Sequence, residues 1–315
     1  MIIKYNIIYY YIILAMNSNK IITLLLFLSI TLIFIWFQKD TAHTNEGFSQ
    51  ATEFLLKEGD DAFDEFYSQI YSTIHKPWKF VDSVSDSIIK YTNIDKEISS
   101  VLLVSSDTGE QSNSLQSKGL NVDSLFKYEY MFNHAKRVYP NIHVQLANFK
   151  NMSMTFDKSS FSHILCLGNI IYTIQDKKTF FRYIYNWLVP GGFFLIQLAD
   201  RSKFNTIKTS NNLEIIDSPQ KYHDERITDS EINFGSFKYL SKYDFKDAET
   251  KNVVYFSETF TDNNTNNVRK NEHILHMENI DEILSMASLC GFEVLRKINI
   301  IEDEHQFIYI LHRKH

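Results

Sequence analysis

Five short strand-like runs separated by helical patterns constrain the fold of this chain more than any other feature of its sequence. The runs lie at residues 101–104, 121–126, 143–146, 163–167 and 193–198, with helical patterns near 129–138 and 177–187. Continuous apolar runs such as VLLV at 101–104 are typical of strands buried on both faces. Strands that alternate with helices are joined by right-handed crossovers, so the sequence predicts an α/β fold with a doubly wound, mostly parallel sheet.

The predicted globular domain, residues 60–315, extends beyond this alternation on both sides. Apolar residues at three- and four-residue spacings predict one helix over 61–71 and a second after Pro77. The segment 202–252 is polar, irregular and rich in tyrosine, which indicates an insertion that carries a lid or a small added sheet. After it we expect a strand at 253–260, a helix at 280–288 and two strands near 292–300 and 306–312.

The stretch 21–37 contains no charged residue and is a candidate membrane span. At 1.5 Å per residue it covers about 25 Å, close to the ~30 Å hydrocarbon core of a bilayer. We therefore expect an uncleaved transmembrane helix, preceded by an interfacial segment at 1–20 and followed by a linker at 38–59; a cleaved signal peptide is the alternative. The chain would then be a single-pass membrane protein.

Two features of this N-terminal region stay open from the sequence. Translation could start at Met1 or at Met16, and the second start would omit most of the interfacial segment. Lys4 and Lys20 precede the predicted span, whereas Lys39 follows it. The lysine counts thus favour a cytoplasmic N-terminus by a margin of one residue, which leaves the side of the globular domain undecided.

Charge and cysteine content exclude several classes of function. A net charge of -6 and a pI near 6.0 give no basic field, so nucleic acid is not expected as a partner. Cys166 and Cys290 are the only cysteines, which excludes a disulfide scaffold and a four-cysteine zinc site. No spacing of His, Cys, Asp or Glu predicts a metal site.

Six sequence pieces, taken in order, carry a resemblance to a known family. They are DEFYSQIY at 64–71, SSVLLVSSDTGE at 99–110, EYMFNHAKRVYPNI at 129–142, FSHILCLGNIIYTIQDKKTFF at 161–181, WLVPGGFFLIQLADRSKF at 187–204 and GFEVLRKI at 291–298. Together they resemble the class I S-adenosylmethionine-dependent methyltransferases, in particular the broad type 11 group that acts on small molecules and lipids. The resemblance implies a Rossmann-like, seven-stranded sheet with an antiparallel C-terminal strand.

The most specific piece is LVPGGFF at 188–194. It resembles the family's turn between the fourth crossover helix and the fifth strand. In this interpretation Pro190 stops the helix, and the two glycines allow a positive φ before the strand begins. A generic helix-to-strand turn is the alternative.

The resemblance also implies a site for the cofactor S-adenosylmethionine. The positions that match the family's cofactor contacts are Tyr67, Ser105, Asp107, Gly109, Phe126, Asn148, Gly168 and Asn169. In the family a Gly-x-Gly-x-Gly loop follows the first strand and a carboxylate at the end of the second strand holds the ribose. Here two of the loop glycines are Ser105 and Asp107, and the ribose position is Phe126 unless a shift of register brings in Asp123.

These replacements have a predictable cost for cofactor binding. A carboxylate at Asp107 near the cofactor's own carboxylate costs about 1 to 4 kcal/mol at 4 Å. Loss of the ribose-binding carboxylate removes roughly 1.5 to 3 kcal/mol of charge-assisted hydrogen bonding. A micromolar site would be weakened by about two to five orders of magnitude. Two hypotheses follow: a membrane-anchored methyltransferase for a small-molecule or lipid acceptor, and a catalytically inactive methyltransferase fold that binds or scaffolds.

Other residues are candidates for the acceptor pocket. Tyr172, with Asn169, follows the fourth strand, where open α/β sheets bind ligands. His163 lies on that strand and is expected to be packed rather than to act as a base. A polar cluster near the end of the chain either lines the acceptor pocket or is surface charge, which we favour: Glu258, Arg269, Glu272, His273 and His276.

Overall fold

The computed structural model divides the chain into two compact units, Met1–Ser49 and Gln50–His315. In the first unit it describes five helical residues, Thr23, Leu26, Phe27, Ser29 and Thr31. In the second it describes residues 53–75, 78–92, 94–105, 107–147, 152, 155–168, 170–208, 219–300 and 303–314. Within these residues no helix is long and apolar enough to cross a membrane. Most of the predicted span 21–37, all of the predicted segment 1–20, and residues 38–52 of the linker lie outside the described part.

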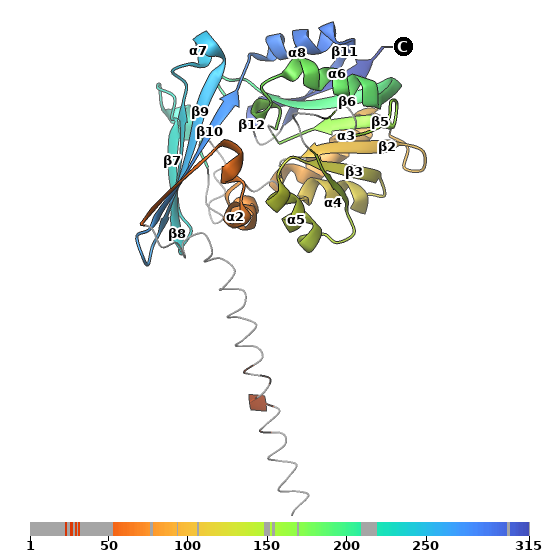
Figure 1. Cartoon of the computed structure of the whole chain (residues 1–315). Coiled ribbons are helices and arrows are strands. Elements are labelled where there is room, and N and C mark those ends of the chain that lie inside the picture. Colours follow the sequence, from red (N-terminus) through yellow and green to blue (C-terminus); the bar gives the residue numbers. More distant parts are fainter. Residues whose placement is uncertain are drawn as a thin grey trace, which may run out of the picture. The chain divides into compact units, whose positions relative to one another are not determined.

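Helices and strands alternate along the second unit much as the sequence predicts (Figure 1). The strands are β1 (Phe54–Glu58), β2 (Ser100–Ser105), β3 (Asn121–Phe126), β4 (His143–Leu146), β5 (Phe161–Cys166), β6 (Leu188–Ala199), β7 (Asp229–Asn233), β8 (Phe237–Asp244), β9 (Val253–Asp262), β10 (Val268–His276), β11 (Phe292–Ile300) and β12 (Asp303–Arg313). The helices are α2 (Glu65–His75), α3 (Trp78–Thr92), α4 (Glu110–Ser117), α5 (Glu129–Val138), α6 (Lys177–Trp187), α7 (Ala248–Lys251) and α8 (Ile280–Leu289), with 3-10 turns η1 (Gly59–Ala62), η2 (Ile170–Thr173) and η3 (Pro219–Tyr222).

The larger sheet confirms the predicted α/β class. Across the described residues it has seven strands in the order β11-β12-β6-β5-β2-β3-β4. Strands β2 to β6 run parallel, whereas β12 is antiparallel to both β6 and β11. Because the strand order reverses direction between β2 and β5, the crevice at their carboxyl ends is where such a fold binds ligands.

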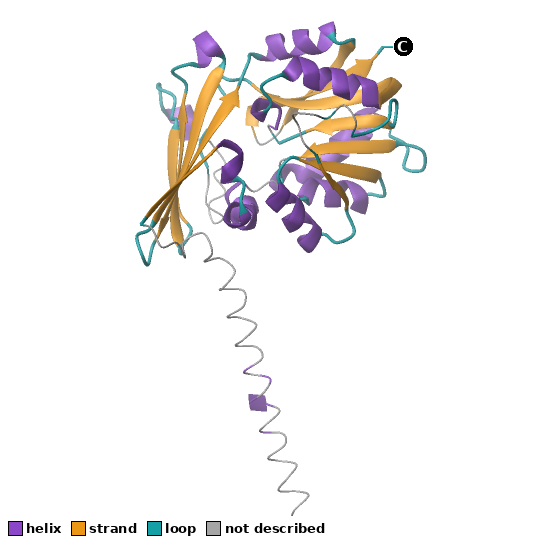
Figure 2. Ribbon diagram, viewed as in Figure 1, coloured by secondary structure: helices purple, strands orange, loops and turns teal. Residues whose placement is uncertain are grey.

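Helices cover both faces of this sheet (Figure 2). Successive residues of a strand point to opposite faces, and β2 illustrates this alternation. Leu102 and Val104 pack in the cluster that contains α6 and α8, whereas Val101 and Leu103 pack with residues of α3 and α4. A strand that is buried on both faces must be apolar throughout, which is why VLLV predicted it correctly.

The turn after α6 differs in detail from the prediction. The helix ends at Trp187, three residues before Pro190, and β6 begins at once. Gly191 has φ +78°, as expected of a paired-glycine turn. Gly192 is required for a different reason: a Cβ there would lie 2.9 Å from the Ser162 and Val189 carbonyl oxygens. One glycine thus provides the turn and the next allows β6 to approach its neighbours closely.

A second sheet corrects the predicted end of the domain. Five strands of the described chain form it, in the order β1-β10-β9-β8-β7. We expected residues 253–260 to continue the main sheet, but β9 and β10 belong to the second one, so the inserted part extends beyond 202–252. Residues buried in the protein alternate with partly exposed ones along β9, as is typical of a sheet with one face covered. That pattern does not reveal which sheet a strand joins.

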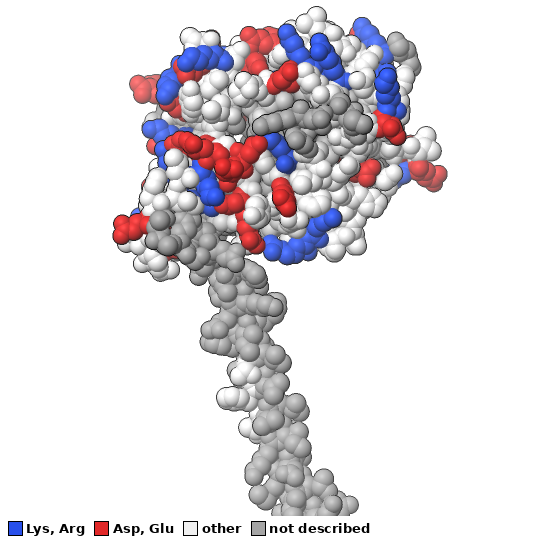
Figure 3. Space-filling model, viewed as in Figure 1, with Lys and Arg blue, Asp and Glu red and all other residues white. Residues whose placement is uncertain are grey.

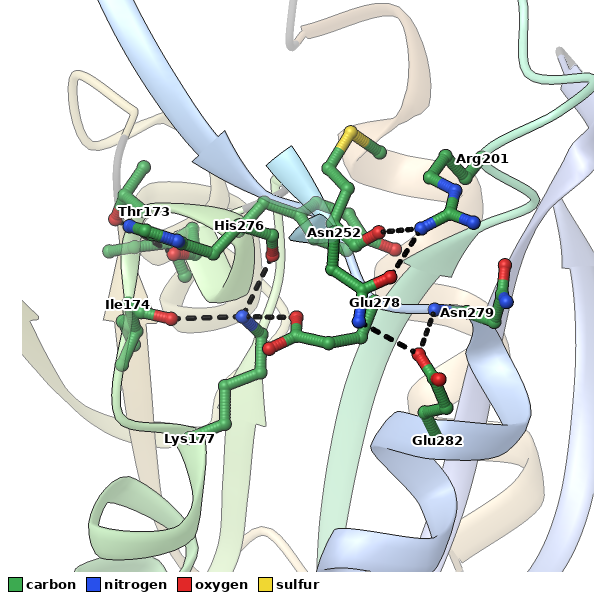
Figure 4. Close-up of polar contacts among 12 residues, drawn as sticks. Thr173, Ile174, Lys177, Arg201, Asn252, His276, Glu278, Asn279 and Glu282 are labelled. Atoms are coloured by element: carbon green, nitrogen blue, oxygen red, sulfur yellow. Dashed lines mark hydrogen bonds and ion pairs between the residues drawn. The ribbon is translucent and has the colours of Figure 1, made fainter. Parts of the chain in front are cut away.

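Buried polar side chains connect the two sheets where β10 ends (Figure 4). The Lys177 ammonium, on the first turn of α6, donates to the Ile174 and His276 carbonyl oxygens at 2.9 and 2.8 Å and lies 2.6 Å from a Glu278 oxygen. Arg201, just after β6, donates to Asn252 Oδ1 and to the Met277 carbonyl at 2.7 and 2.9 Å. We call Lys177, Arg201, Asn252 and Glu278 the inter-sheet clamp.

Replacing Lys177 by methionine is expected to lower the free energy of unfolding by about 2–4 kcal/mol, because two carbonyls and a carboxylate lose a buried partner. Lys178→Met, on the exposed side of the same turn, is the matched control and should stay within about 0.5 kcal/mol. Urea unfolding of both variants measures the difference. Equal stability of the two variants would show that the clamp does not hold the sheets together.

Candidate functional site

A cavity of about 180 Å³ lies between the two sheets. Gly168 and Ala199, at the carboxyl ends of β5 and β6, form one side of it. Residues of the second sheet, including Phe256 and His273, form the opposite side, and α2 contributes Tyr67, Tyr71 and His75. Ligands of open α/β folds bind at the carboxyl ends of the strands, so this cavity is the candidate binding site.

A buried carboxylate, Glu258, lies behind this cavity. Its side chain has no exposed surface, and its partners come from three elements. Tyr239 of β8 donates to Oε1 at 2.7 Å, His273 Nε2 of β10 lies 3.1 Å from Oε2, and His75 Nε2 of α2 lies 3.6 Å from Oε1. Both histidines also line the cavity, so Glu258 orients two imidazoles that a bound ligand can reach.

Burial and charge fix the protonation of this cluster. Burial alone would raise the pKa of Glu258, but hydrogen bonds from His273 and His75 outweigh burial and hold that pKa well below its ordinary value. Burial, and then the charge of Lys208, lower the pKa of His75, which favours a neutral imidazole. Burial also raises the pKa of Tyr67, whose hydroxyl lies 2.9 Å from His75 Nε2. A neutral histidine beside an ionised carboxylate is the arrangement of a general base.

Lys208 adds a cation to the cavity wall beside His75. Its ammonium lies 3.3 Å from His75 Nδ1, and its backbone N–H donates to Ser230 Oγ at 3.1 Å. Burial lowers the pKa of Lys208, and the charge of Glu258 partly offsets that effect. An ammonium donates only, so the Nδ1 lone pair faces Lys208 and the His75 proton sits on Nε2, toward Tyr67 and Glu258.

The loop that the resemblance assigns to the cofactor is closed by its own side chains. The Asp107 carboxylate accepts the Gly109 N–H at 2.9 Å, and the Glu110 carboxylate accepts the Thr108 N–H at 3.1 Å. Ser72 of α2 hydrogen-bonds to both Thr108 and Glu110. Two N–H groups of the loop just before α4, those of Thr108 and Gly109, therefore already have carboxylate partners from this chain.

Two features of Gly109, its backbone conformation and its surroundings, call for glycine. Its φ of +102° at the N-cap of α4 favours glycine. A Cβ at this position would lie 3.0 to 3.1 Å from side-chain atoms of Tyr139, Ala135 and Ile142. Glycine is thus needed here to pack α4 against α5 as well as for the turn.

The structure places the other residues that match the family's cofactor contacts in different surroundings. Phe126 is the last residue of β3 and is paired in register with Ser105 of β2. Its side chain is fully buried among residues of α5. Asp123 pairs with Leu102 three residues earlier and is half exposed, so the alternative register is wrong. Gly168 has φ +68° and donates its N–H to Gln197 Oε1 at 2.9 Å. Asn148 and Asn169 lie outside the described residues.

The residues present do not fit the family's way of holding S-adenosylmethionine. The turn at Gly109 and the strand ends are in place, but the loop N–H groups are occupied by Asp107 and Glu110. Phe126 has no polar atom for a ribose hydroxyl.

The structure also shows the surroundings of His163 and of the polar cluster around Glu258. His163 is packed, as expected: it is 4% exposed and stacks on Phe193. The cluster around Glu258 is not surface charge, because Glu258, Arg269 and His273 are buried. Arg269 has a structural role, since it binds both Asp64 oxygens at 2.9 and 3.0 Å. Within the part of the chain that the structure describes, no group of His, Cys, Asp or Glu could hold a metal ion.

Sequence reasoning missed three residues of the site. His75 and Lys208 lie 133 positions apart, and Tyr239 lies in the segment interpreted as an insertion. His75 ends the observed helix α2, beyond the predicted helix 61–71, and its spacing of eight residues from Tyr67 puts both on the same side of the helix. That spacing was the one available signal, and it does not point to Lys208.

Comparison with known proteins agrees with this fold. Residues 102–196 match the family model described as a methyltransferase domain. No curated protein sequence matches the chain. Among solved structures, a S-adenosylmethionine-dependent methyltransferase from Clostridium acetobutylicum has a TM-score of 0.58 at 14% identity, over 79% of this chain and 98% of that one.

Two further structures resemble the chain to a similar degree. The CcbJ methyltransferase from Streptomyces caelestis has a TM-score of 0.59 at 13% identity, over 81% of this chain and 99% of that one. An amino pentose methyltransferase of calicheamicin biosynthesis from Micromonospora echinaspora, solved with S-adenosylmethionine bound, has a TM-score of 0.56 at 14% identity, over 80% and 98%. At these identities the likeness concerns the fold.

The packed His163 predicts a pH dependence of stability. Burial lowers the pKa of His163 to about 4 from 6.5. Between these values the unfolded chain binds a proton that the folded chain does not, so the free energy of unfolding falls as pH drops, by about 3 kcal/mol in total. His163→Phe should flatten this fall, as measured by urea unfolding at several pH values between 7 and 4. An unchanged slope in the variant would contradict the assignment.

Proposed function

We propose that this chain, which carries a class I S-adenosylmethionine-dependent methyltransferase domain, methylates a small-molecule or lipid acceptor bound in the cavity between its two sheets. The observation that carries the proposal is the base at this cavity. His75 faces it from α2 with Glu258 behind, at the carboxyl ends of the strands where the fold binds its ligands. The amino pentose methyltransferase and its relatives of this fold act on small molecules, which supports a small acceptor.

The residues of this chain have distinct roles in the proposed reaction. His75 accepts a proton at Nδ1 once the acceptor displaces the Lys208 ammonium from that atom, and Glu258, 3.6 Å from Nε2, orients the ring and stabilises the charge that develops on it. Aromatic side chains such as Tyr67, Tyr71 and Phe256 enclose the acceptor, which excludes water and strengthens these interactions. The chain thus provides positioning and a base.

A second candidate is a methyltransferase fold that binds a ligand without catalysis. It is favoured by one observation, the cofactor loop in which Asp107 and Glu110 occupy the N–H groups and Phe126 replaces an acidic residue. In this case the cavity would remain a binding site and the domain a scaffold. Binding of S-adenosylmethionine distinguishes the two candidates.

Calorimetric titration of S-adenosylmethionine and S-adenosylhomocysteine into the purified full chain distinguishes the methyltransferase from the binding-only candidate. The first candidate requires binding by the unmodified chain, and Asp107→Gly should tighten it by about tenfold or more because one negative charge is removed. Asp107→Asn is the matched control that removes the charge but keeps the side-chain acceptor. Absence of binding up to about millimolar cofactor, restored by Asp107→Gly, would reject the first candidate in favour of the second.

We also propose that residues 21–37 attach the domain to a membrane as a single-pass anchor, with the acceptor reached near the bilayer. The uncharged length of this stretch supports the proposal. On the face of the molecule in Figure 3, acidic and basic side chains are interspersed, and we propose no nucleic-acid partner. Extraction of membranes with alkaline carbonate tests the anchor: the chain should stay with the membrane, and its release would contradict an integral span.

A further inference from the structure

We propose that the two sheets open about the inter-sheet clamp, which acts as a hinge, and that this opening joins the cavity between the sheets to a second cavity beside it. The side that opens is the one where the segment 59–75 meets the loops after β2 and β3. Such an opening would admit ligands to a methyltransferase and to a binding-only domain alike.

The segment that contains α2 belongs to the same body as the second sheet. Strand β1, just before it, pairs with β10 along its whole length. Arg269 of β10 donates to both Asp64 oxygens at 2.9 and 3.0 Å and to the Ala62 carbonyl at 3.2 Å. Residues 54–75 and the second sheet therefore form one body, and the larger sheet with its helices forms the other. Helix α2 lies beside α5 of that other body (Figure 1).

Two contacts join these bodies at the turn between β3 and α5. Lys127, the residue after β3, donates to Asp60 Oδ1 at 2.8 Å. The Phe63 ring stacks on the Tyr128 ring, with centroids 3.7 Å apart and an angle of 3° between the planes. We call Asp60, Phe63, Lys127 and Tyr128 the latch.

A third contact on this side can separate without leaving a buried carboxylate unpaired. Ser72 of α2 hydrogen-bonds to Thr108 and Glu110 of the loop after β2. Without Ser72, the Glu110 carboxylate keeps the Thr108 N–H at 3.1 Å and the Thr108 hydroxyl at 2.7 Å. The Ser72 hydroxyl can then bond to water, so this contact does not lock the two bodies together.

The exposure of the charged groups decides which side opens. The Asp60 side chain is 61% exposed and that of Lys127 is 15% exposed, so water can replace each partner when the pair separates. Ion pairs of this kind contribute little to stability. In the clamp, the Lys177 side chain has no exposed surface, and loss of Glu278 would leave its charge buried without a carboxylate. The sheets therefore separate at the latch and stay joined at the clamp.

The latch stands between two cavities. Asp60, Lys127 and Thr173 line the cavity between the sheets and also a second cavity of about 860 Å³. The wall of the second cavity includes Leu146 at the end of β4 and Asp176 at the start of α6. Side chains that line two neighbouring cavities form the partition between them, so movement of the latch opens one cavity to the other. A group-transfer reaction needs two ligands in direct contact, which a joined crevice allows.

Double electron–electron resonance on the purified full chain measures the distance between the two bodies. Spin labels are attached at Lys238→Cys on β8 and at Asn133→Cys on α5, both of which are exposed positions. Cys290 is replaced by serine, and Cys166 is buried and does not react. We expect one main distance and a minor population at longer distance, which is the open state.

Variants of the latch should enrich the open state. Lys127→Met should raise its population about threefold, and the double variant with Phe63→Leu about tenfold, because the ion pair and the ring stack are lost. Lys118→Met is the matched control. It removes a pair with Asp86 at 2.7 Å that has similar exposure but lies at the C-terminal end of α4, and it should leave the distances unchanged.

A second pair of labels distinguishes opening from general loosening. Labels at Ile98→Cys and Asn133→Cys both lie on the body of the larger sheet, and their distance should stay the same in every variant. The inference is overturned if the first pair gives equal distances in Lys127→Met and Lys118→Met, or if both pairs broaden together. None of these measurements involves a cofactor or an acceptor. Opening without methyl transfer would therefore reject the proposed function alone, and methyl transfer by a domain that does not open would reject this inference alone.

Discussion

A carboxylate without exposed surface needs partners, and the site of this protein depends on how Glu258 obtains them. The hydroxyl of Tyr239 and the rings of His273 and His75 come from β8, β10 and α2. Burying an unpaired carboxylate would cost several kcal/mol, so these three elements are held together around it. The same contacts turn His75 and His273 toward the cavity. One buried charge therefore both joins α2 to the second sheet and orients the groups that a ligand meets.

Helix α2 links the two parts of the crevice. Ser72, in its last turn, hydrogen-bonds to Thr108 and Glu110 of the loop that leads into α4. His75, one turn further on, contacts Glu258 and Lys208. The loop that would meet a cofactor and the wall that would meet an acceptor are thus fixed to one rigid element. On the other side of the cavity, the inter-sheet clamp anchors the end of β10 to α6.

The two parts of the crevice differ in their polar groups. At the loop, carboxylates of this chain accept from the Thr108 and Gly109 N–H groups. At the cavity, the Tyr67 hydroxyl and the Lys208 ammonium lie within hydrogen-bonding distance of His75, and Glu258 lies within hydrogen-bonding distance of His273. A cavity lined by aromatic and titratable side chains, beside a loop whose Thr108 and Gly109 N–H groups are already hydrogen-bonded, is compatible with both proposed functions.

The sequence by itself determined the main sheet, because strands buried on both faces must be apolar and their crossover helices must be amphipathic. The family resemblance singled out Asp107, Gly109 and Phe126, which the structure places between β2 and α4 and at the end of β3. The sequence could not assign β9 and β10 to a second sheet. Alternation of buried and partly exposed residues shows that one face of a strand is covered, but it does not show which element covers that face. Only the tertiary structure brought His75, Lys208 and Glu258 together, since these residues come from three separate elements and no local pattern relates them. The cavity is a product of how two sheets and one helix pack, and packing of distant segments is the information that local periodicity lacks.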